Sequence, residues 1–505
     1  MSGPGQDPFA TSRAQFDAIT RFLDSPEAAN LNHYELEVQV RDRGRDLLRS
    51  LVQNYFDHRA DHEPRLEGVT DAQGVQRTRV ERGHHRLLTT IFGDVRIDRA
   101  AYRSPGHPNL HPTDAVLNLP PEQHSHLLRR MAATEAARGS FEEAASALER
   151  DTGQPIGKRQ VEELTRHAAK DVDAFYESAP RKPVAPADIL VLSADGKGVV
   201  MRHDALRSAT KAAAEKSSPK IATRLSKGEK RNRKRMAEVA AVYDAAPVPR
   251  VPEDILAPAD RAATDGGPEQ EAPAPKAQNK LLMAGVVDDA ATVIHQMFAE
   301  ADRRDPNHAR PWVALVDGNQ HQIDRINAEA QSRALSVTIV IDIIHVLEYL
   351  WKAAWSFYPE GDPRAEAWVR EKALAILRGK AGVVAAAVRR KATCLALAKE
   401  RRKGAAVCAD YLLSKKRYLD YPTALQRGWP IDTGVIEGAC RHLIKDRMDI
   451  TGARWGLDGA EAVLKLRALR TNGDFDAYWT FHLEQEHRRV HQARYANGRI
   501  PLAAA

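Results

Sequence analysis

The sequence predicts a mixed α/β protein, because strand-like and helix-like patterns alternate through its middle. Three apolar runs, at residues 189–195, 311–317 and 337–342, each end in an aspartate, and the second and third are followed by helix-like segments. Residues 346–425 are almost wholly helical in pattern and rich in Ala, Arg and Lys. A sheet flanked by helices, with a large all-helical part attached, is the expected architecture.

The N-terminal region is predicted to be mainly helical. In residues 1–64, apolar side chains recur at helical spacing: Phe16, Ile19, Phe22, Leu23, Leu47, Leu48, Leu51, Val52 and Phe56. Residues 65–120 predict a small β-hairpin subdomain, with strands at 87–92 and 95–99 joined across Gly93-Asp94. The Pro- and His-rich residues 104–113 are expected to form an irregular loop.

Residues 121–180 have the outline of a helix-turn-helix. One helix around 141–148 ends at Gly153, and a second begins near Gly157 and carries Lys158 and Arg159. An ordinary helical hairpin gives the same pattern, so DNA binding by Lys158 and Arg159 is one of two interpretations.

A long insertion is expected at residues 202–280. Residues 202–235 contain twelve Lys/Arg and three Asp/Glu, a net charge of +9 against +7 for the whole chain. Residues 244–279 hold seven prolines, seven acidic and three basic residues. Such a composition buries too little apolar surface to offset its ordering entropy, so most of 202–280 is predicted to be disordered. A strand or its start is expected at 236–243, and β character at 281–297.

Acidic residues mark the candidate chemistry. Asp195 and Asp317 end apolar runs and precede glycine, which places both carboxylates where an α/β sheet binds ligands. Two carboxylates brought together repel unless a cation lies between them, and Mg²⁺ prefers hard oxygen ligands. Paired metal ions activate the attacking oxygen and stabilise the leaving one in phosphodiester displacement. Glu437, on a helix predicted to begin near Thr433, is the candidate third ligand.

The helix bearing Glu437 also offers cations. In a regular α-helix Glu437, Arg441 and Lys445 share one stripe, with a carboxylate for metal and two cations for phosphates. A surface row of ion pairs is the plain alternative. Gly434 and Gly438 each cost about 1 kcal/mol in a helix, which favours close approach by another group.

Several segments together resemble bacterial insertion-sequence transposases of the Kra type and, more distantly, Mutator-like transposases. They are Leu192-Ser193-Ala194-Asp195-Gly196-Lys197-Gly198, Val316-Asp317-Gly318-Asn319, Ile341-Asp342-Ile343-Ile344-His345-Val346-Leu347-Glu348-Tyr349-Leu350, Thr433-Gly434-Val435-Ile436-Glu437-Gly438-Ala439-Cys440-Arg441 and Gly452-Ala453-Arg454-Trp455. The similarity covers residues 190–475. It implies a ribonuclease-H-like core with a helical insertion before the glutamate helix, and a metal-binding triad of Asp195, Asp317 and Glu437 that uses Mg²⁺ or Mn²⁺ on terminal inverted repeats and target DNA.

Other residues in these segments have two interpretations each. Asp342 competes with Asp317 for the second acidic position, and Asp342 with His345 is otherwise expected beside the metal ligands or DNA. Lys197 is a candidate phosphate contact or a solvated lysine. Arg454 and Trp455 are candidates to clamp and stack on an unpaired base, with core packing the alternative for Trp455.

These predictions define the domain plan and the expected biology. The boundaries are 1–64, 65–120, 121–180, 185–345 for the first part of the core, 346–428 for the helical insertion, 429–475 for the catalytic helix and end of the core, and 476–505 for a helical tail. Three scattered cysteines and no signal or membrane segment predict a cytoplasmic protein, and the resemblance to insertion-sequence transposases implies a bacterial one. Joining two DNA ends requires a homodimer or larger assembly. A catalytically inactive DNA-binding regulator is the alternative function, and a nuclease that never joins strands is a third.

Overall fold

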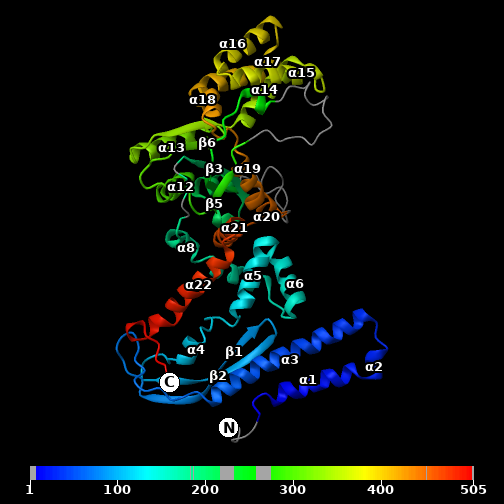
Figure 1. Cartoon of the computed structure of the whole chain (residues 1–505), viewed down its shortest axis with the longest axis vertical. Coiled ribbons are helices and arrows are strands. Elements are labelled where there is room, and N and C mark those ends of the chain that lie inside the picture. Colours follow the sequence, from blue (N-terminus) through cyan, green and yellow to red (C-terminus); the bar gives the residue numbers. More distant parts are fainter. Residues whose placement is uncertain are drawn as a thin grey trace. The chain divides into compact units, whose positions relative to one another are not determined.

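The computed structural model describes residues 7–181, 184–185, 187–216, 233–256, 274–450 and 452–502. The chain divides into two compact units, coloured along the sequence in Figure 1. Unit 1 combines residues 1–178 with residues 473–505, and unit 2 spans residues 179–472. The predicted tail at 476–505 thus belongs to the same unit as the N-terminal region.

Unit 1 begins with helices and a hairpin, as predicted. These elements are α1 (Ala10–Leu23), α2 (Pro26–Ala29), α3 (His33–Asp61), β1 (Arg79–Thr90) and β2 (Gly93–Arg103). The predicted turn at Gly93-Asp94 is wrong by two residues, because Gly93 and Asp94 already pair with Thr90 and Thr89 in the antiparallel ladder. The Thr90 hydroxyl donates to the Gly93 carbonyl at 2.8 Å, which closes the turn over residues 91–92.

Short helices complete unit 1. They are α4 (Pro112–Val116), α5 (His126–Arg138), α6 (Phe141–Thr152), α7 (Lys158–Ala168), α8 (Val172–Ser178) and α22 (Phe475–Val490). The helix-turn-helix outline is present, since α6 ends at Gly153 in the left-handed conformation (φ 71°) and α7 follows after four residues. Apolar side chains of α5, α6 and α7, among them Leu128 and Leu148, form their common core. The fully buried Arg129 of α5 donates to both carboxylate oxygens of Glu486, which ties α22 to this bundle.

Unit 2 contains a five-stranded mixed sheet. Its strands are β3 (Ile189–Val200), β4 (Lys234–Ala245), β5 (Ala277–Gly285), β6 (Trp312–Val316) and β7 (Val337–Ile341). The strand order is β5-β4-β3-β6-β7, with β4 antiparallel to both of its neighbours and β3, β6 and β7 parallel. The central strands are buried on both faces, which explains their continuous apolar sequences. The predicted mixed α/β class is therefore confirmed.

The structure corrects three expectations in unit 2. β3 does not end at Asp195, because its antiparallel pairing with β4 continues to Val200. Residues 290–304 form helix α12 (Ala290–Arg304) rather than a strand, since Asp289 caps its first turn by accepting from the amide of Thr292. Within 202–280 lie α9 (Ser208–Glu215), β4, α11 (Pro252–Ile255) and the start of β5, so the insertion is more ordered than predicted. The remaining predicted disorder, at 217–232 and 257–273, lies outside the described residues.

Helices follow the sheet, as predicted. They are α13 (Gln320–Ser332), α14 (Ile343–Phe357), α15 (Pro363–Leu377), α16 (Ala381–Cys394), α17 (Lys399–Ser414), the turn η3 (Lys416–Tyr418), α18 (Tyr421–Gln426), α19 (Gly434–Ala439), the π-helical turn η4 (Cys440–Lys445), α20 (Asp446–Met448) and α21 (Leu457–Asn472). Helix α14 leads from the edge of the sheet into the helical insertion, and α19 returns to the sheet (Figure 1). None of the described helices combines the length and apolar character that crossing a membrane requires.

Candidate active site

Asp342 is the buried centre of the site. It follows β7 and caps α14, where its Oδ1 accepts from the amide of Ile344 at 2.8 Å. Its Oδ2 accepts a short hydrogen bond from the hydroxyl of Thr433 and lies 3.2 Å from Nδ1 of His345. The side chain has no exposed surface, so each of these contacts compensates for lost hydration of the carboxylate.

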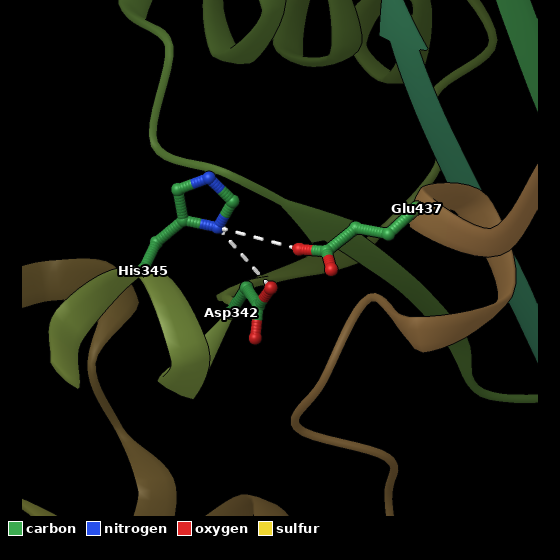
Figure 2. Close-up of side chains that lie close together, drawn as sticks. All are labelled: Asp342, His345 and Glu437. Atoms are coloured by element: carbon green, nitrogen blue, oxygen red, sulfur yellow. Dashed lines mark hydrogen bonds and ion pairs between the residues drawn. The ribbon is translucent and has the colours of Figure 1, made fainter. Parts of the chain in front are cut away.

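Glu437 approaches this carboxylate from α19. Its Oε1 lies 3.2 Å from the Thr433 hydroxyl oxygen and 3.8 Å from Nδ1 of His345. Figure 2 shows the His345 ring facing both carboxylates, with one ring nitrogen directed toward Asp342 and Glu437. The Glu437 side chain is 45% exposed, whereas that of Asp342 is fully buried. Glu437 therefore remains open to a ligand from solvent, and Asp342 does not.

The charges of these three groups are interdependent. Burial raises the pKa of Asp342, but hydrogen bonds from His345 and Thr433 outweigh it, so the pKa lies below its usual value. The hydrogen bond with Asp342 raises the pKa of His345 despite burial of the ring. Burial and the charge of Asp342 raise the pKa of Glu437. A positively charged His345 thus stabilises two neighbouring carboxylates.

Asp195 lies next to the glutamate helix. It is half-buried in β3, and its Oδ1 accepts from the amide of Gly196 at 2.7 Å. The buried Cys440 thiol, in η4 directly after α19, lies close enough to Asp195 for the carboxylate charge to act on it. Burial and the charge of Asp195 raise the pKa of this thiol, so Cys440 is a packing residue and not a nucleophile.

Sequence reasoning missed Glu238. It lies on β4 directly opposite Gly196, and a Cβ on Gly196 would come within 2.6 Å of a Glu238 carboxylate oxygen. Burial, then the charge of Asp195, raises the pKa of Glu238 to about 7. The glycine after Asp195 was visible in the sequence and indicates that another group approaches closely. The strand register that pairs Gly196 with Glu238 could not be read from the sequence.

Asp317 lies beyond the end of β6. It is half-buried, its Oδ1 accepts from the amide of Asn319 at 2.7 Å, and its carbonyl accepts from the Tyr411 hydroxyl at 3.1 Å. The intervening Gly318 has a φ of +94°, which a residue with a side chain adopts only with strain. The negative charge of Asp317 also acts on His345 and raises its pKa further. Asp317 thus borders the same group of side chains.

The predicted triad and the observed cluster overlap in one residue. Within the described parts of the chain, a single group of three potential metal ligands brings its donor atoms within 4.8 Å of one another, and it consists of Asp342, His345 and Glu437. Asp195 and Asp317 flank this group without joining it. The structure therefore places Glu437 against Asp342, the competitor of Asp317.

Oxygen donors for a hard cation are present. Asp195, Asp317 and Glu437 each expose part of their side chains, whereas Asp342 is enclosed by three donors from the protein. This division fits Mg²⁺ or Mn²⁺, which prefer carboxylate oxygens and retain water ligands. Asp342 and His345 are better placed to hold Glu437 in position than to bind such a cation.

The predicted cations differ in their positions. Arg441, Lys445 and Arg454 are exposed in unit 2, Lys197 is half-buried on β3, and Lys158 and Arg159 are exposed at the start of α7 in unit 1. Glu437, Arg441 and Lys445 are all exposed, but they do not lie on one regular α-helix, because the α-helix ends at Ala439 and continues as a π-helical turn.

Two further expectations are corrected by local packing. Trp455 is 6% exposed, its indole N–H donates to the Met448 carbonyl at 3.0 Å, and the Arg447 guanidinium covers its ring. Trp455 is therefore a core residue in this structure, as the alternative interpretation predicted, and its buried ring is not available for stacking. A Cβ placed on Gly438 meets no described atom within 4 Å, so packing within the protein does not require that glycine.

Comparison of the sequence with models of known protein families and with curated proteins finds no match.

Proposed function

We propose that this chain is a DNA transposase of a bacterial insertion sequence, which cuts the element ends and joins them to target DNA through Asp195, Asp317 and Glu437. The main observation is that acidic residues on or directly after β3, β6, β7 and α19 come to one region of unit 2. Asp195 and Glu437, the first and last of them, are more than 240 positions apart in the sequence. The glutamate helix and the turn after it contact β3, which carries Asp195. His345 lies 3.8 Å from Glu437 and is affected by the charge of Asp317.

The topology of unit 2 supports a ribonuclease-H-like core. In such cores three antiparallel strands precede two strands that lie parallel to the first, as in the order β5-β4-β3-β6-β7. The large helical segment from α14 to α18 stands between β7 and α19, where the resemblance to Kra-type transposases expects an insertion. The glutamate returns to the sheet after this insertion, because α19 and η4 contact β3.

The site residues divide into two roles in this proposal. Asp195, Asp317 and Glu437 would hold Mg²⁺ or Mn²⁺, and the bound metal would lower the barrier to attack on a phosphodiester. Thr433, Asp342 and His345 fix the position of Glu437 through the contacts described above. These positioning residues also set the charge around Glu437, since the protonated His345 offsets the charge of buried Asp342.

DNA contacts follow from the exposed cations. Arg441, Lys445 and Arg454 supply exposed positive charge in unit 2, and half-buried Lys197 follows Asp195 by two residues on β3. In unit 1 the start of α7, with Lys158 and Arg159, is the proposed reader of the terminal repeats. Water first cleaves the element end, and the freed 3′-hydroxyl then attacks target DNA.

The test is cleavage and strand transfer by full-length protein on DNA that carries the flanking element ends, with Mg²⁺ or Mn²⁺. Glu437→Gln should bind DNA with unchanged affinity and lose at least about 100-fold in cleavage rate, because a metal ligand is removed without loss of volume. Glu366→Gln, at an exposed position of α15, is the matched control and should keep full activity.

Each outcome decides between functions. Cleavage and joining by the wild type, with loss in Glu437→Gln alone, supports the transposase. Cleavage without joining indicates a nuclease. Specific DNA binding without cleavage in either metal contradicts the transposase and favours a DNA-binding regulator with the same fold.

A further inference from the structure

The helical insertion carries a concentrated positive charge that the proposed active site does not use. We call residues 378–417, which contain α16, α17 and η3, the basic hairpin. This segment has twelve Lys/Arg and two Asp/Glu, a net charge of +10 that exceeds the +7 of the whole chain. Its helices α16 and α17 lie at the end of the insertion labelled uppermost in Figure 1.

Part of this charge is neutralised within the hairpin. Arg389 pairs with Asp410 at 2.5 Å, Lys391 donates to the Tyr358 hydroxyl, and Arg402 donates to the Thr393 hydroxyl. These contacts link α16 with α17 and with the end of α14. The buried Val388, Ala392, Ala405, Cys408 and Ala409 pack along the same two helices. These contacts and this packing fix the two helices relative to each other, and so fix the backbone positions of the remaining cations.

The remaining cations are exposed. Among the described residues, no side-chain hydrogen bond or ion pair is made by the exposed Arg390, Lys399, Arg401, Lys403 and Lys416. Four of them lie near the junction of α16 and α17. Like charges at this density repel one another, and the repulsion is relieved only by ions or by an anionic partner.

Helix stability does not account for these residues. Lys399, Arg401, Arg402 and Lys403 lie in the first two turns of α17, whose positive dipole end disfavours cations by about 0.3–1 kcal/mol each. Glu400 is the only acidic residue among them. The same side chains placed at the other end of α17 would stabilise it, so their position indicates a partner outside the chain.

The composition of the hairpin indicates the partner. Residues 381–410 contain no Phe, Trp or Tyr, the side chains that stack on unpaired bases. Arginine and lysine without aromatic residues match the phosphate backbone of a duplex, which is bound mainly through counterion release.

We propose that the basic hairpin binds the phosphate backbone of double-stranded DNA without reading its sequence. The inference rests on the proposed function for the identity of the polyanion. It adds to that function a second DNA contact, remote in sequence from the predicted helix-turn-helix and from the acidic residues. Its role is to hold DNA that the element-specific contacts of unit 1 do not hold.

The test measures binding of full-length protein to a random-sequence duplex of roughly 30 base pairs, in EDTA, between about 50 and 200 mM KCl. The variant replaces Arg390, Lys399, Arg401 and Lys403 with Gln. The control replaces four exposed cations elsewhere, Lys170, Lys276, Lys280 and Arg325, with Gln. A third protein, Arg390→Lys with Arg401→Lys, keeps the charge.

The hairpin variant should bind at least about tenfold more weakly. Its slope of log affinity against log salt should be smaller by up to about 3.6, because each of the four lost phosphate contacts contributes about 0.9. The control and the charge-preserving protein should keep the wild-type slope. Equal slopes for the hairpin variant and wild type overturn the proposal. So does an unchanged duplex affinity with lost binding to vesicles of about 30% phosphatidylserine in phosphatidylcholine, which assigns the hairpin to membranes.

This experiment is independent of the transposition assay. It needs neither element ends nor divalent metal, so a protein that never joins DNA strands still tests the hairpin. In the converse result, the wild type joins DNA strands while the hairpin variant keeps the wild-type salt slope. That result supports the proposed function and overturns the proposal for the basic hairpin. Thermal melting of each variant identifies misfolding, and substitutions at these four exposed positions should leave the Tm unchanged.

Discussion

Replacing Asp342 with Asn tests whether this carboxylate organises the site. The change keeps the volume of the side chain but removes its charge and one acceptor atom. The buried carboxylate receives hydrogen bonds from Thr433, His345 and the amide of Ile344. An asparagine oxygen replaces one carboxylate oxygen, so either the amide of Ile344 or the Thr433–His345 pair loses its acceptor.

The expected magnitude follows from burial. A hydrogen bond to a charged group contributes about 1.5–3 kcal/mol, and breaking a buried ion pair costs about 3–5 kcal/mol. The His345 side chain is 27% exposed, which reduces the upper figure by solvent screening. We therefore expect the free energy of unfolding of unit 2, which spans residues 179–472, to fall by about 3 kcal/mol. For a unit of this size the Tm should fall by about 6 °C.

Differential scanning calorimetry measures this loss, with Asp324→Asn as the control. Asp324 is exposed on α13 and accepts one hydrogen bond, from Gln320, so its substitution should change Tm by less than about 1 °C. A Tm of the Asp342→Asn protein within about 2 °C of wild type refutes the claim that Asp342 organises this site.

The same contacts predict a pH dependence and a requirement for glycine. Because the hydrogen bond with Asp342 raises the pKa of His345, its stabilising contribution is complete below about pH 6.5 and is lost as the pH rises through the folded-state value. The Tm difference between wild type and His345→Gln should therefore shrink as the pH rises above neutrality, and a constant difference contradicts the pairing. Gly318→Ala should destabilise unit 2 by at least about 1 kcal/mol, because φ is +94° and the new Cβ would lie 2.6 Å from the Tyr411 hydroxyl. A calorimetric Tm equal to that of wild type would exclude both effects.

Local sequence patterns predicted many elements of the fold correctly. The apolar runs of β6 and β7 and the helix α13 between them are recognisable because buried parallel strands and amphipathic helices have distinct periodicities. The first part of α12, with Thr292, Val293 and Ile294 in succession, resembled a strand. Its helical form depends on the Asp289 cap and on burial of Met297 and Phe298 against the sheet, which tertiary packing decides.

The site was less predictable because its geometry depends on register and helix phase. Pairing of Gly196 with Glu238 joins two strands separated by a long insertion, and sequence spacing does not define that register. A π-helical turn follows Ala439, where the sequence predicted one continuous α-helix through Lys445. Strand register is decided by packing across the sheet and not by the local preference of the residues.

The choice between Asp317 and Asp342 shows what structure adds. β6 and β7 are adjacent parallel strands, so Asp317 and Asp342, which directly follow them, lie at the same edge of the sheet. Their positions in the sequence therefore do not show which of the two is the metal ligand. Their surroundings differ: Asp342 is fully buried and bonded to three donors, whereas Asp317 is partly exposed and accepts from one backbone amide through its side chain. A carboxylate already enclosed by protein donors has little capacity for a cation, and one open to solvent retains it. This contrast favours Asp317 as the metal ligand and Asp342 as the residue that positions Glu437, which is why the Asp342→Asn protein should lose stability as well as activity.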